Sequence, residues 1–226
     1  LITFFTILFC LTSSVGYSQN MICEYTGFSC PEIDSEELIV KDGHYYKKFT
    51  DVPFTGNVTG LYQGFMKDGK ENGSWVFYWN NGKLMSKGNL KNGKKEGSWV
   101  GYHDNGQLWE KGEYNNGNRV GLWVEYNDKG RLLKNGELKN GIKEGLWIEY
   151  SVDKKIETKG KYNKGKKDGN WVYYRENGKL KTKGDFINGN ENGSWVSYFD
   201  NGQIETKGDF INGKEYGSWV SYFDNG

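Results

Sequence analysis

Tryptophan recurs in this chain at a fixed spacing of 24 residues. In every copy a glycine stands two positions before the tryptophan and a tyrosine stands three positions after it. A strict period of this length is typical of tandem-repeat proteins, in which each copy is one structural unit that packs against its neighbours. The tryptophans are Trp75, Trp99, Trp123, Trp147, Trp171, Trp195 and Trp219. The tyrosines are Tyr78, Tyr102, Tyr126, Tyr150, Tyr174, Tyr198 and Tyr222. We expect both sets to serve mainly in packing between the repeats.

Each repeat is predicted to contain two strands joined by turns. The segment from the glycine to the tyrosine, G-x-W-V-x-Y, is aromatic and β-branched, which favours a strand. An Asn-Gly pair follows, and it favours a tight hairpin turn because it tolerates positive φ at both central positions. Such pairs are Asn81-Gly82, Asn105-Gly106 and Asn201-Gly202. A second strand, such as residues 203–210, leads to another turn, such as residues 212–214. Residues 51–226 show no helical period.

The composition fits a thin sheet whose interior is made of aromatic rings. Only 35% of the chain is hydrophobic and its mean hydropathy is −0.81, which is too polar for a two-layer core, yet 16% is aromatic. One hairpin is not stable alone in water, but stacked hairpins can bury Trp and Tyr rings of roughly 150–250 Å² each. Of the 33 glycines, 27 keep the 24-residue period, and we expect glycine to leave room for a ring from the adjacent hairpin. The predicted fold class is all-β, an elongated single-layer antiparallel β-hairpin ribbon or solenoid.

Residues 1–18 are predicted to be a signal peptide that is truncated at its N-terminus. The apolar run at residues 1–12 is uncharged and too short to span a bilayer, and small polar residues follow it. A buried N-terminal strand is the alternative. A signal peptide implies export, so we expect a secreted, periplasmic or cell-surface protein. Residues 19–37 form a cysteine-containing N-terminal segment.

Two cysteines, Cys23 and Cys30, follow the predicted signal peptide. An even pair in an exported chain favours a disulfide that closes a short loop. Two free thiols are the alternative. Since two ligands alone cannot form a structural zinc site, we expect no metal centre here.

The pattern G-x-W-V-x-Y-x-x-N-G-x-L-x-x-K-G-x-Y-x-N-G-K resembles the MORN repeat, in the variant form found in bacterial YwqK-family antitoxins. The segment Pro53–Gly56 looks like the entry motif of such arrays, and Leu38–Phe49, with a turn at Asp42-Gly43, resembles the hairpin that precedes it. On this resemblance, residues 38–60 are a leading hairpin and residues 61–226 hold seven tandem repeats, the last one incomplete. The resemblance implies an elongated β-ribbon used for binding or scaffolding, with toxin neutralisation as a narrower role.

Residues that carry chemistry do not recur with the repeat. The two histidines, His44 and His103, are isolated, and an acid–base site needs several groups brought together. Acidic residues stand beside a lysine column, which favours a solvated face with cross-strand ion pairs. The 30 basic and 29 acidic residues give a net charge of +1, which argues against nucleic-acid binding because that needs a basic excess. We expect no catalytic site, no cofactor and no nucleic-acid partner.

Four aromatic residues outside the repeated set are candidate contacts with a partner: Trp79, Trp109, Phe77 and Tyr173. The two tryptophans stand at positions where other repeats have polar residues such as Ser151 or Glu157, whereas Phe77 and Tyr173 share a strand face with the repeated tryptophans. Exposed aromatic side chains of this kind are typical of binding surfaces. Packing at the sheet edge is the alternative.

These features predict a non-enzymatic exported scaffold that binds a protein partner. A module that binds carbohydrate or the cell wall is the alternative, because W-V-S-Y-F-D-N-G superficially resembles choline-binding wall repeats, whose aromatic hairpins cage quaternary ammonium groups. Those repeats have a shorter period and more aromatic residues after the tryptophan. The near-zero net charge disfavours association with membrane lipid.

Overall fold

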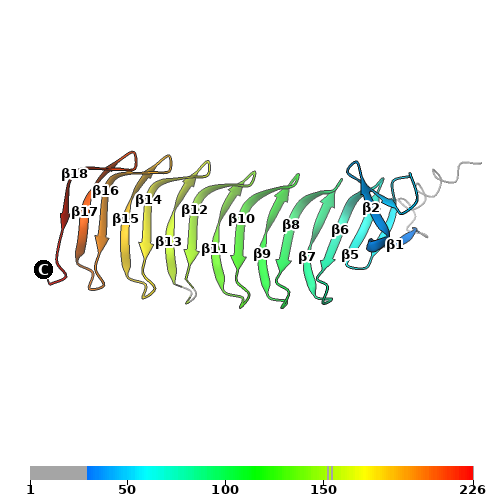
Figure 1. The fold of residues 1–226 in the computed structure, drawn as a ribbon, viewed down its shortest axis with the longest axis horizontal. Coiled ribbons are helices and arrows are strands. Elements are labelled where there is room, and N and C mark those ends of the chain that lie inside the picture. Colours follow the sequence, from blue (N-terminus) through cyan, green and yellow to red (C-terminus); the bar gives the residue numbers. More distant parts are fainter. Residues whose placement is uncertain (1–29, 152, 154, 226) are drawn as a thin grey trace, which may run out of the picture.

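The computed structural model describes residues 30–151, 153 and 155–225, and these residues form one long sheet and one small hairpin (Figure 1). The sheet has 16 strands, and from β5 onward each strand is hydrogen-bonded to its neighbours in the chain. Its strands are β1 (Glu32–Asp34), β4 (Gly56–Thr59), β5 (Tyr62–Lys67), β6 (Lys70–Tyr78), β7 (Leu84–Lys91), β8 (Lys94–Tyr102), β9 (Leu108–Asn115), β10 (Asn118–Tyr126), β11 (Leu132–Lys139), β12 (Ile142–Tyr150), β13 (Ile156–Asn163), β14 (Lys166–Tyr174), β15 (Leu180–Ile187), β16 (Asn190–Tyr198), β17 (Ile204–Ile211) and β18 (Lys214–Ser221). β1 pairs with β4 in parallel, and the other pairs are antiparallel. The predicted all-β ribbon of hairpins is confirmed.

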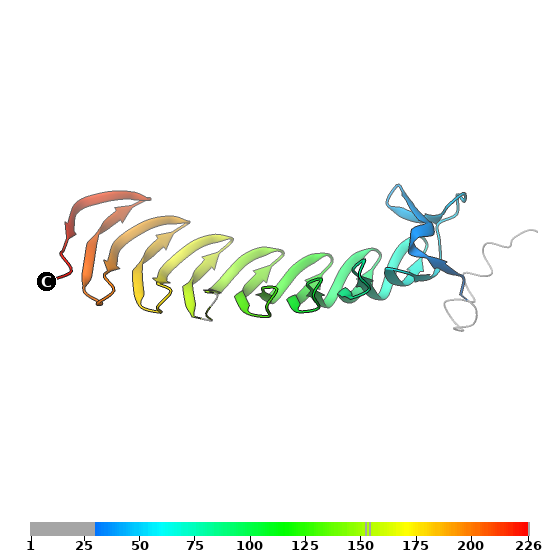
Figure 2. The same ribbon diagram turned by 60° about the horizontal axis from the view of Figure 1, so that its bottom comes forward.

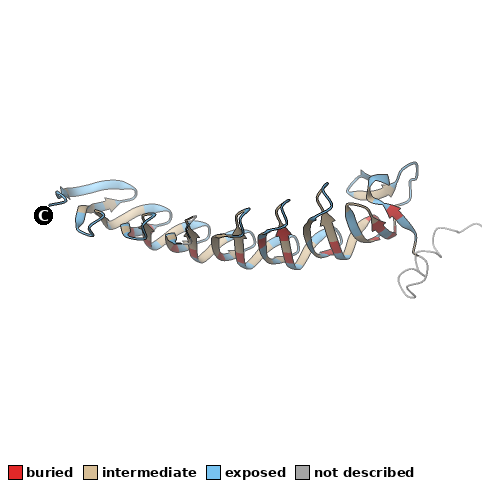
Figure 3. Cartoon of the chain, turned by 90° about the horizontal axis from the view of Figure 1, so that it is seen from below, coloured by how far each residue is buried: buried red, intermediate tan, exposed pale blue. Residues whose placement is uncertain are grey.

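The ribbon is elongated because each strand from β5 onward pairs only with the strands next to it in the chain. The strands run across the long axis of the molecule (Figure 1), and each hairpin is curled (Figure 2). The ribbon also bows along its length, with the buried residues in a line along it (Figure 3). Copies distant in sequence therefore do not meet, as expected for a solenoid.

Two kinds of turn alternate along the ribbon, and the tight one is not where the sequence predicted it. The turn between β7 and β8 has two left-handed residues, because Asn92 and Gly93 have φ of 51° and 77°. It is the second turn of its repeat, and the first is the turn between β6 and β7. At the first turn only Gly82 has a positive φ, and the loop from Trp79 to Lys83 is wider. The turn predicted at Asn81-Gly82 is present, but the expectation of positive φ at both central residues is wrong there and at Asn105-Gly106 and Asn201-Gly202.

The wider turn is explained by the hydrogen bonds that it makes. The Gly82 N–H donates to the Trp79 carbonyl at 2.8 Å, which closes a four-residue turn, and the Trp79 N–H donates to the Lys83 carbonyl at 2.8 Å. The Asn81 side chain accepts a hydrogen bond from the Lys83 N–H at 3.0 Å. Asparagine therefore serves here through its side-chain oxygen, and only glycine needs the left-handed conformation.

A bulge bends every second strand near its centre. In β8, Glu96 pairs with Asn89 and Trp99 pairs with Gly88, so Gly97 and Ser98 have no partner on β7. Gly97 has φ of 65°, and a Cβ atom there would meet nothing within 4 Å. Glycine is thus required at this position by the backbone conformation, and the bulge produces the bend.

The core is a single file of rings in which each tryptophan lies flat on a glycine. A Cβ atom on Gly88 would lie 2.4 Å from the Trp99 ring, so only glycine fits beneath it. The Trp99 indole N–H donates to the Asn89 carbonyl at 3.0 Å. Tyr114 then packs edge-on between Trp99 and Trp123, with ring centroids 6.1 and 5.2 Å away. The expectation that glycine makes room for a ring is confirmed.

The N-terminal hairpin covers the first tryptophan. It consists of β2 (Leu38–Lys41) and β3 (His44–Lys47), joined at Asp42-Gly43, and follows the short helical turn η1 (Ser35–Glu37). The Tyr45 N–H donates to the Gly69 carbonyl at 2.8 Å. Leu38 and Tyr45 pack against the core cluster that contains Trp75.

The predicted signal peptide, residues 1–18, and Cys23 lie outside the described residues. Cys30 is disulfide-bonded. Among the described residues, the helical content is the three-residue turn η1, and nothing helical there has the length and apolar character needed to cross a membrane.

Candidate functional site

The long sheet has two faces with different chemistry. We call the face that carries the repeated tryptophans the tryptophan face; by the alternation of strand side chains it also carries Phe77, Glu110 and Tyr114. The other face carries the repeated tyrosines, which are half-buried apart from the exposed Tyr222. Lysine ammonium groups lie over three of these tyrosine rings at 5.6–5.9 Å: the pairs are Lys159–Tyr174, Lys183–Tyr198 and Lys207–Tyr222.

A column of basic residues covers the tryptophan rings in the middle of the ribbon. Lys95 Nζ lies 4.2 Å from the Trp99 ring centroid, and the equivalent residues of the next three repeats repeat the contact. These contacts are Arg119 Cζ over Trp123 at 4.1 Å, Lys143 Nζ over Trp147 at 4.3 Å and Lys167 Nζ over Trp171 at 4.3 Å. Each ring is thus held between a glycine backbone below and a cation above, which the negative face of the ring attracts.

Carboxylates bind some of these cations and complete a polar network. Arg119 Nη2 lies 2.8 Å from Glu110 Oε2 and its Nη1 lies 3.9 Å from Glu125 Oε1. Lys134 Nζ also contacts Glu125, at 2.9 Å. Burial raises the pKa of Glu110, and the nearby Arg119 only partly offsets that effect. The network therefore fixes Arg119 over its ring at some electrostatic cost.

Phe77 and Tyr173 both lie on the tryptophan face, next to the repeated rings. Phe77 packs between Trp75 and Trp99, with centroid distances of 5.9 and 6.0 Å. Tyr173 contacts Trp171 at 6.2 Å, and its hydroxyl accepts a hydrogen bond from Lys167 Nζ at 2.8 Å. Each of the two side chains is half-buried, so each keeps part of its surface in water.

Trp79 and Trp109 line one small hollow. It has a volume of about 220 Å³, and Gly101 and Trp99 also line it. The hollow exists because Gly101 occupies the position that Phe77 fills one repeat earlier. Trp109 is 44% exposed, whereas the Trp79 indole N–H donates to the Tyr102 carbonyl at 3.2 Å. Trp79 thus contributes to packing between repeats as well as to this hollow.

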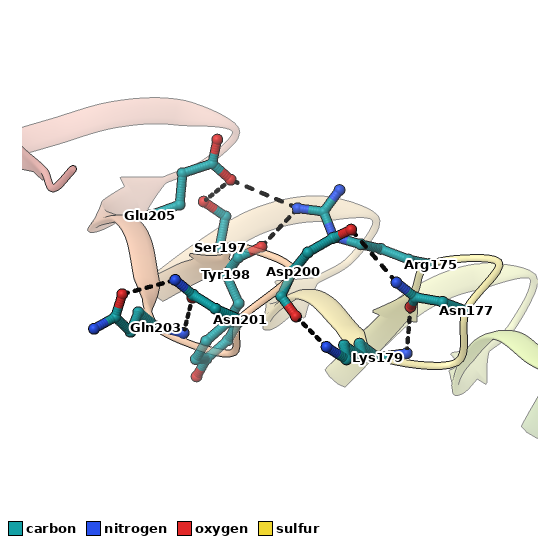
Figure 4. Close-up of polar contacts among 9 residues, drawn as sticks. All are labelled: Arg175, Asn177, Lys179, Ser197, Tyr198, Asp200, Asn201, Gln203 and Glu205. Carbon is teal, nitrogen blue, oxygen red and sulfur yellow. Dashed lines mark hydrogen bonds and ion pairs between the residues drawn. The ribbon is translucent and has the colours of Figure 1, made fainter. Parts of the chain in front are cut away.

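The turns form a polar row that links each repeat to the next. His103 and Arg175 stand at the position of Trp79 in their repeats, and their side chains also reach the carbonyl of the next repeated tyrosine, at 3.1 and 2.6 Å. Arg175 Nε further contacts Asp200 at 2.9 Å, and Lys179 donates to the Asp200 carbonyl (Figure 4). The Asn201 side-chain amide donates to the Asp224 carbonyl at 2.9 Å. This row is structural in character.

The face of the sheet opposite the tryptophan face carries a shallow apolar depression. It has a volume of about 600 Å³ and is lined in part by Val76, Val100 and Val124. Leu122, which is 57% exposed, stands at its margin. Elsewhere in the described part of the chain, no group of three or more His, Cys, Asp or Glu side chains is placed to hold a metal ion.

Sequence reasoning missed the basic column over the rings. The signal was present, because aligning the repeats places Lys95, Arg119, Lys143 and Lys167 four residues before their tryptophans. In a regular strand that spacing also predicts one shared face, but the bulge glycine between the two residues obscures the alternation.

The model of the MORN repeat variant family matches residues 71–92, 95–116, 167–188 and 191–212. No curated protein sequence matches the chain.

Solved structures similar to the chain include a GtfA/B complex bound to UDP and GlcNAc, at 12% identity and a TM-score of 0.22, over 49% of this chain and 22% of that chain. They also include an S. aureus TarM mutant in complex with Fondaparinux, alpha-GlcNAc-glycerol and UDP, at 11% identity and a TM-score of 0.20, over 64% and 19%. The chain thus spans about a fifth of the length of these structures, and TM-scores this low carry no functional meaning. The described chain is a β-hairpin repeat protein, and four of its segments match the MORN repeat variant.

Proposed function

We propose that the chain is a non-catalytic, exported scaffold that binds a protein partner along its tryptophan face. The support is a contrast between constant and variable positions on that face. The tryptophans and the glycines beneath them are the same in every copy, and Trp75 to Trp171 are at most 5% exposed. Two residues after each tryptophan the side chain varies among the copies, with five residue types at seven positions: Phe77, Gly101, Glu125, Glu149, Tyr173, Ser197 and Ser221.

This contrast is the observation that carries the proposal. A constant buried frame supplies stability as a sum of neighbour contacts, while the variable column presents aromatic, acidic or small side chains in different parts of the ribbon. Extended repeat surfaces of this kind are suited to recognising another macromolecule over many weak contacts. Export is proposed from the apolar run at residues 1–12, and toxin neutralisation is a narrower form of the same binding role.

The test is binding to a purified partner with matched surface variants. The chain is immobilised, proteins of the source envelope fraction are captured, and the recovered partner is purified and titrated calorimetrically. The variant Glu149→Ser/Tyr173→Ser changes the variable column, and Leu122→Ser/Leu146→Ser changes exposed residues of the other face. Circular dichroism checks that both variants fold.

A loss of affinity of about tenfold or more in the first variant alone supports the proposal. Equal affinity of both variants and the parent chain would refute binding through the tryptophan face. Turnover of a substrate by the purified chain would refute the non-catalytic part.

Glycan binding is the second candidate, favoured by the hollow beside Trp109. An exposed indole next to a small hollow can stack on the apolar face of a sugar ring, since ligand pockets are lined mainly by hydrophobic and aromatic side chains. Titration of oligosaccharides into the chain and into Trp109→Ala, followed by tryptophan fluorescence, separates the candidates. A saturable change that Trp109→Ala abolishes would favour the glycan role over the protein scaffold.

A further inference from the structure

We propose that Trp195, Phe186, Phe210 and Glu191 form a site for a lysine or arginine side chain of a protein partner. The inference rests on the proposed scaffold function, because it supplies the chemistry of one contact with that partner. Its starting point is the basic column described above. In four successive repeats the chain places its own cation over a tryptophan ring, within 4.1–4.3 Å of the ring centroid.

Among the described residues, no lysine or arginine lies over the Trp195 ring. The residue at the equivalent position is Glu191, in the strand register directly opposite Phe186. Glu191 makes no ion pair with any residue that the structure describes. The reversal of charge therefore removes the cation from this position and puts a carboxylate on the same strand face as the Phe186 ring.

Burial of the rings follows this change of charge. Trp99, Trp123, Trp147 and Trp171, each under its own cation, are at most 5% exposed. Trp195 is only partly buried, although strands continue on both sides of it. The first repeat also has an acidic residue, Glu71, but there the N-terminal hairpin supplies cover, since Tyr45 and Leu38 pack on the cluster around Trp75.

The remaining walls of the site are aromatic. The Phe186 and Phe210 rings stand edge-on to Trp195, with centroid distances of 5.2 and 5.9 Å and interplanar angles of 83° and 77°. The indole plane is the floor, since it lies on Gly184, where a Cβ atom would come within 2.2 Å of the ring. Glu215, opposite Phe210 in the register, adds a second carboxylate.

This combination selects a cation of defined chemistry. An aromatic floor with a nearby carboxylate attracts a positively charged group by both ring quadrupole and Coulomb interaction. The chain itself shows which groups fit, because lysine and arginine side chains occupy the same position in the preceding repeats. The partner is therefore expected to present a basic side chain to the C-terminal repeats.

The test follows the indole N–H signals of the full chain by ¹⁵N NMR during titration with a lysine peptide. The probe is a peptide with a single lysine among uncharged residues, because one basic side chain is the proposed ligand. The same peptide with norleucine in place of the lysine is the uncharged control. The Trp195 signal, identified by Trp195→Phe, should shift saturably, whereas Trp99 and Trp147, which lie under their own cations, should not.

Two opposite substitutions make the test reciprocal. Glu191→Lys supplies the missing cation and should weaken peptide binding by about tenfold or more. Lys167→Glu uncovers Trp171 and should add a second responding indole signal. Asp209→Lys changes the charge identically on the other face of β17 and should leave binding unchanged.

A Trp195 signal that does not move in the folded chain, or equal affinity of Glu191→Lys and Asp209→Lys, overturns the inference. A shift with the norleucine peptide as large as with lysine also overturns it. If the peptide fails while the purified partner still binds through the variable column, the site is wrong and the scaffold function stands. If the partner itself does not bind while the peptide does, the scaffold function fails and the cation site stands.

Discussion

Replacing Gly88 by alanine should destabilise the ribbon because the methyl group has no space. The added Cβ would lie 2.4 Å from two atoms of the Trp99 ring, whereas non-bonded carbons prefer roughly 3.5–4.0 Å. The ring must therefore retreat by roughly 1 Å. Its indole N–H is held by the Asn89 carbonyl at 3.0 Å, and its outer face is covered by Lys95.

The magnitude follows from those contacts. Overpacking of a well-packed site costs about 1–3 kcal/mol, and loss of the indole hydrogen bond adds about 1 kcal/mol. We expect Gly88→Ala to lower the free energy of unfolding by about 2–4 kcal/mol. Urea unfolding followed by circular dichroism and by tryptophan fluorescence measures this loss, and agreement of the two signals checks that one transition is being compared.

A double-mutant cycle separates this steric cause from a backbone cause. In a Trp99→Ala background no ring opposes the new methyl, so Gly88→Ala should cost much less, with a coupling energy of about 1–2 kcal/mol. Gly97→Ala is the matched control, because its φ of 65° is strained but its Cβ meets nothing. Its cost should be the same with or without the Trp99 ring. A coupling near zero at Gly88 would show that the close approach is not what requires glycine there.

Three further predictions concern single side chains. The pKa of Glu110 is raised in the folded chain. The Glu110 side chain therefore contributes most to the free energy of unfolding below the ordinary pKa of glutamate, and this contribution is lost as the pH rises through the raised pKa. The stability of Glu110→Gln relative to the parent should therefore increase with pH in urea unfolding; a decrease would contradict the burial argument. Lys143→Met removes the cation over Trp147 and should cost about 0.5–1 kcal/mol in the same assay, while unchanged stability would show that the contact contributes nothing. Lys164 has φ of 50° where most copies have asparagine, so Lys164→Asn should raise the unfolding free energy by about 0.5–1 kcal/mol, and a loss would contradict the strain.

The fold could be predicted from the sequence because its period leaves few solutions. A tryptophan every 24 residues, with glycine and tyrosine at fixed offsets, predicts stacked hairpins, and the close fit of Trp99 on Gly88 explains why those residue types cannot vary. The turn types were less accessible. Asn-Gly occurs at both turns, and which one is tight depends on loop length and on the bulge, which a dipeptide does not encode.

The candidate site was only partly predictable for a related reason. Phe77 and Tyr173 were placed beside the repeated rings by simple alternation, and they lie there. In a chain that is 26% charged, the sequence does not distinguish the lysines that lie over rings from other charged residues. The two bulge residues also break the strand alternation that would assign these lysines to the tryptophan face. The meaning of Glu191 emerges only once its neighbours are known to hold cations over tryptophan.

Since the strands cross the long axis, their hydrogen bonds point along it (Figure 1). A tensile load applied between the two ends therefore acts along those bonds. It breaks the bonds of one strand pair after another, and it does not have to break many bonds at the same time. The molecule should extend under low force in small, even steps, each releasing one hairpin, and rewind from whichever segment stays intact.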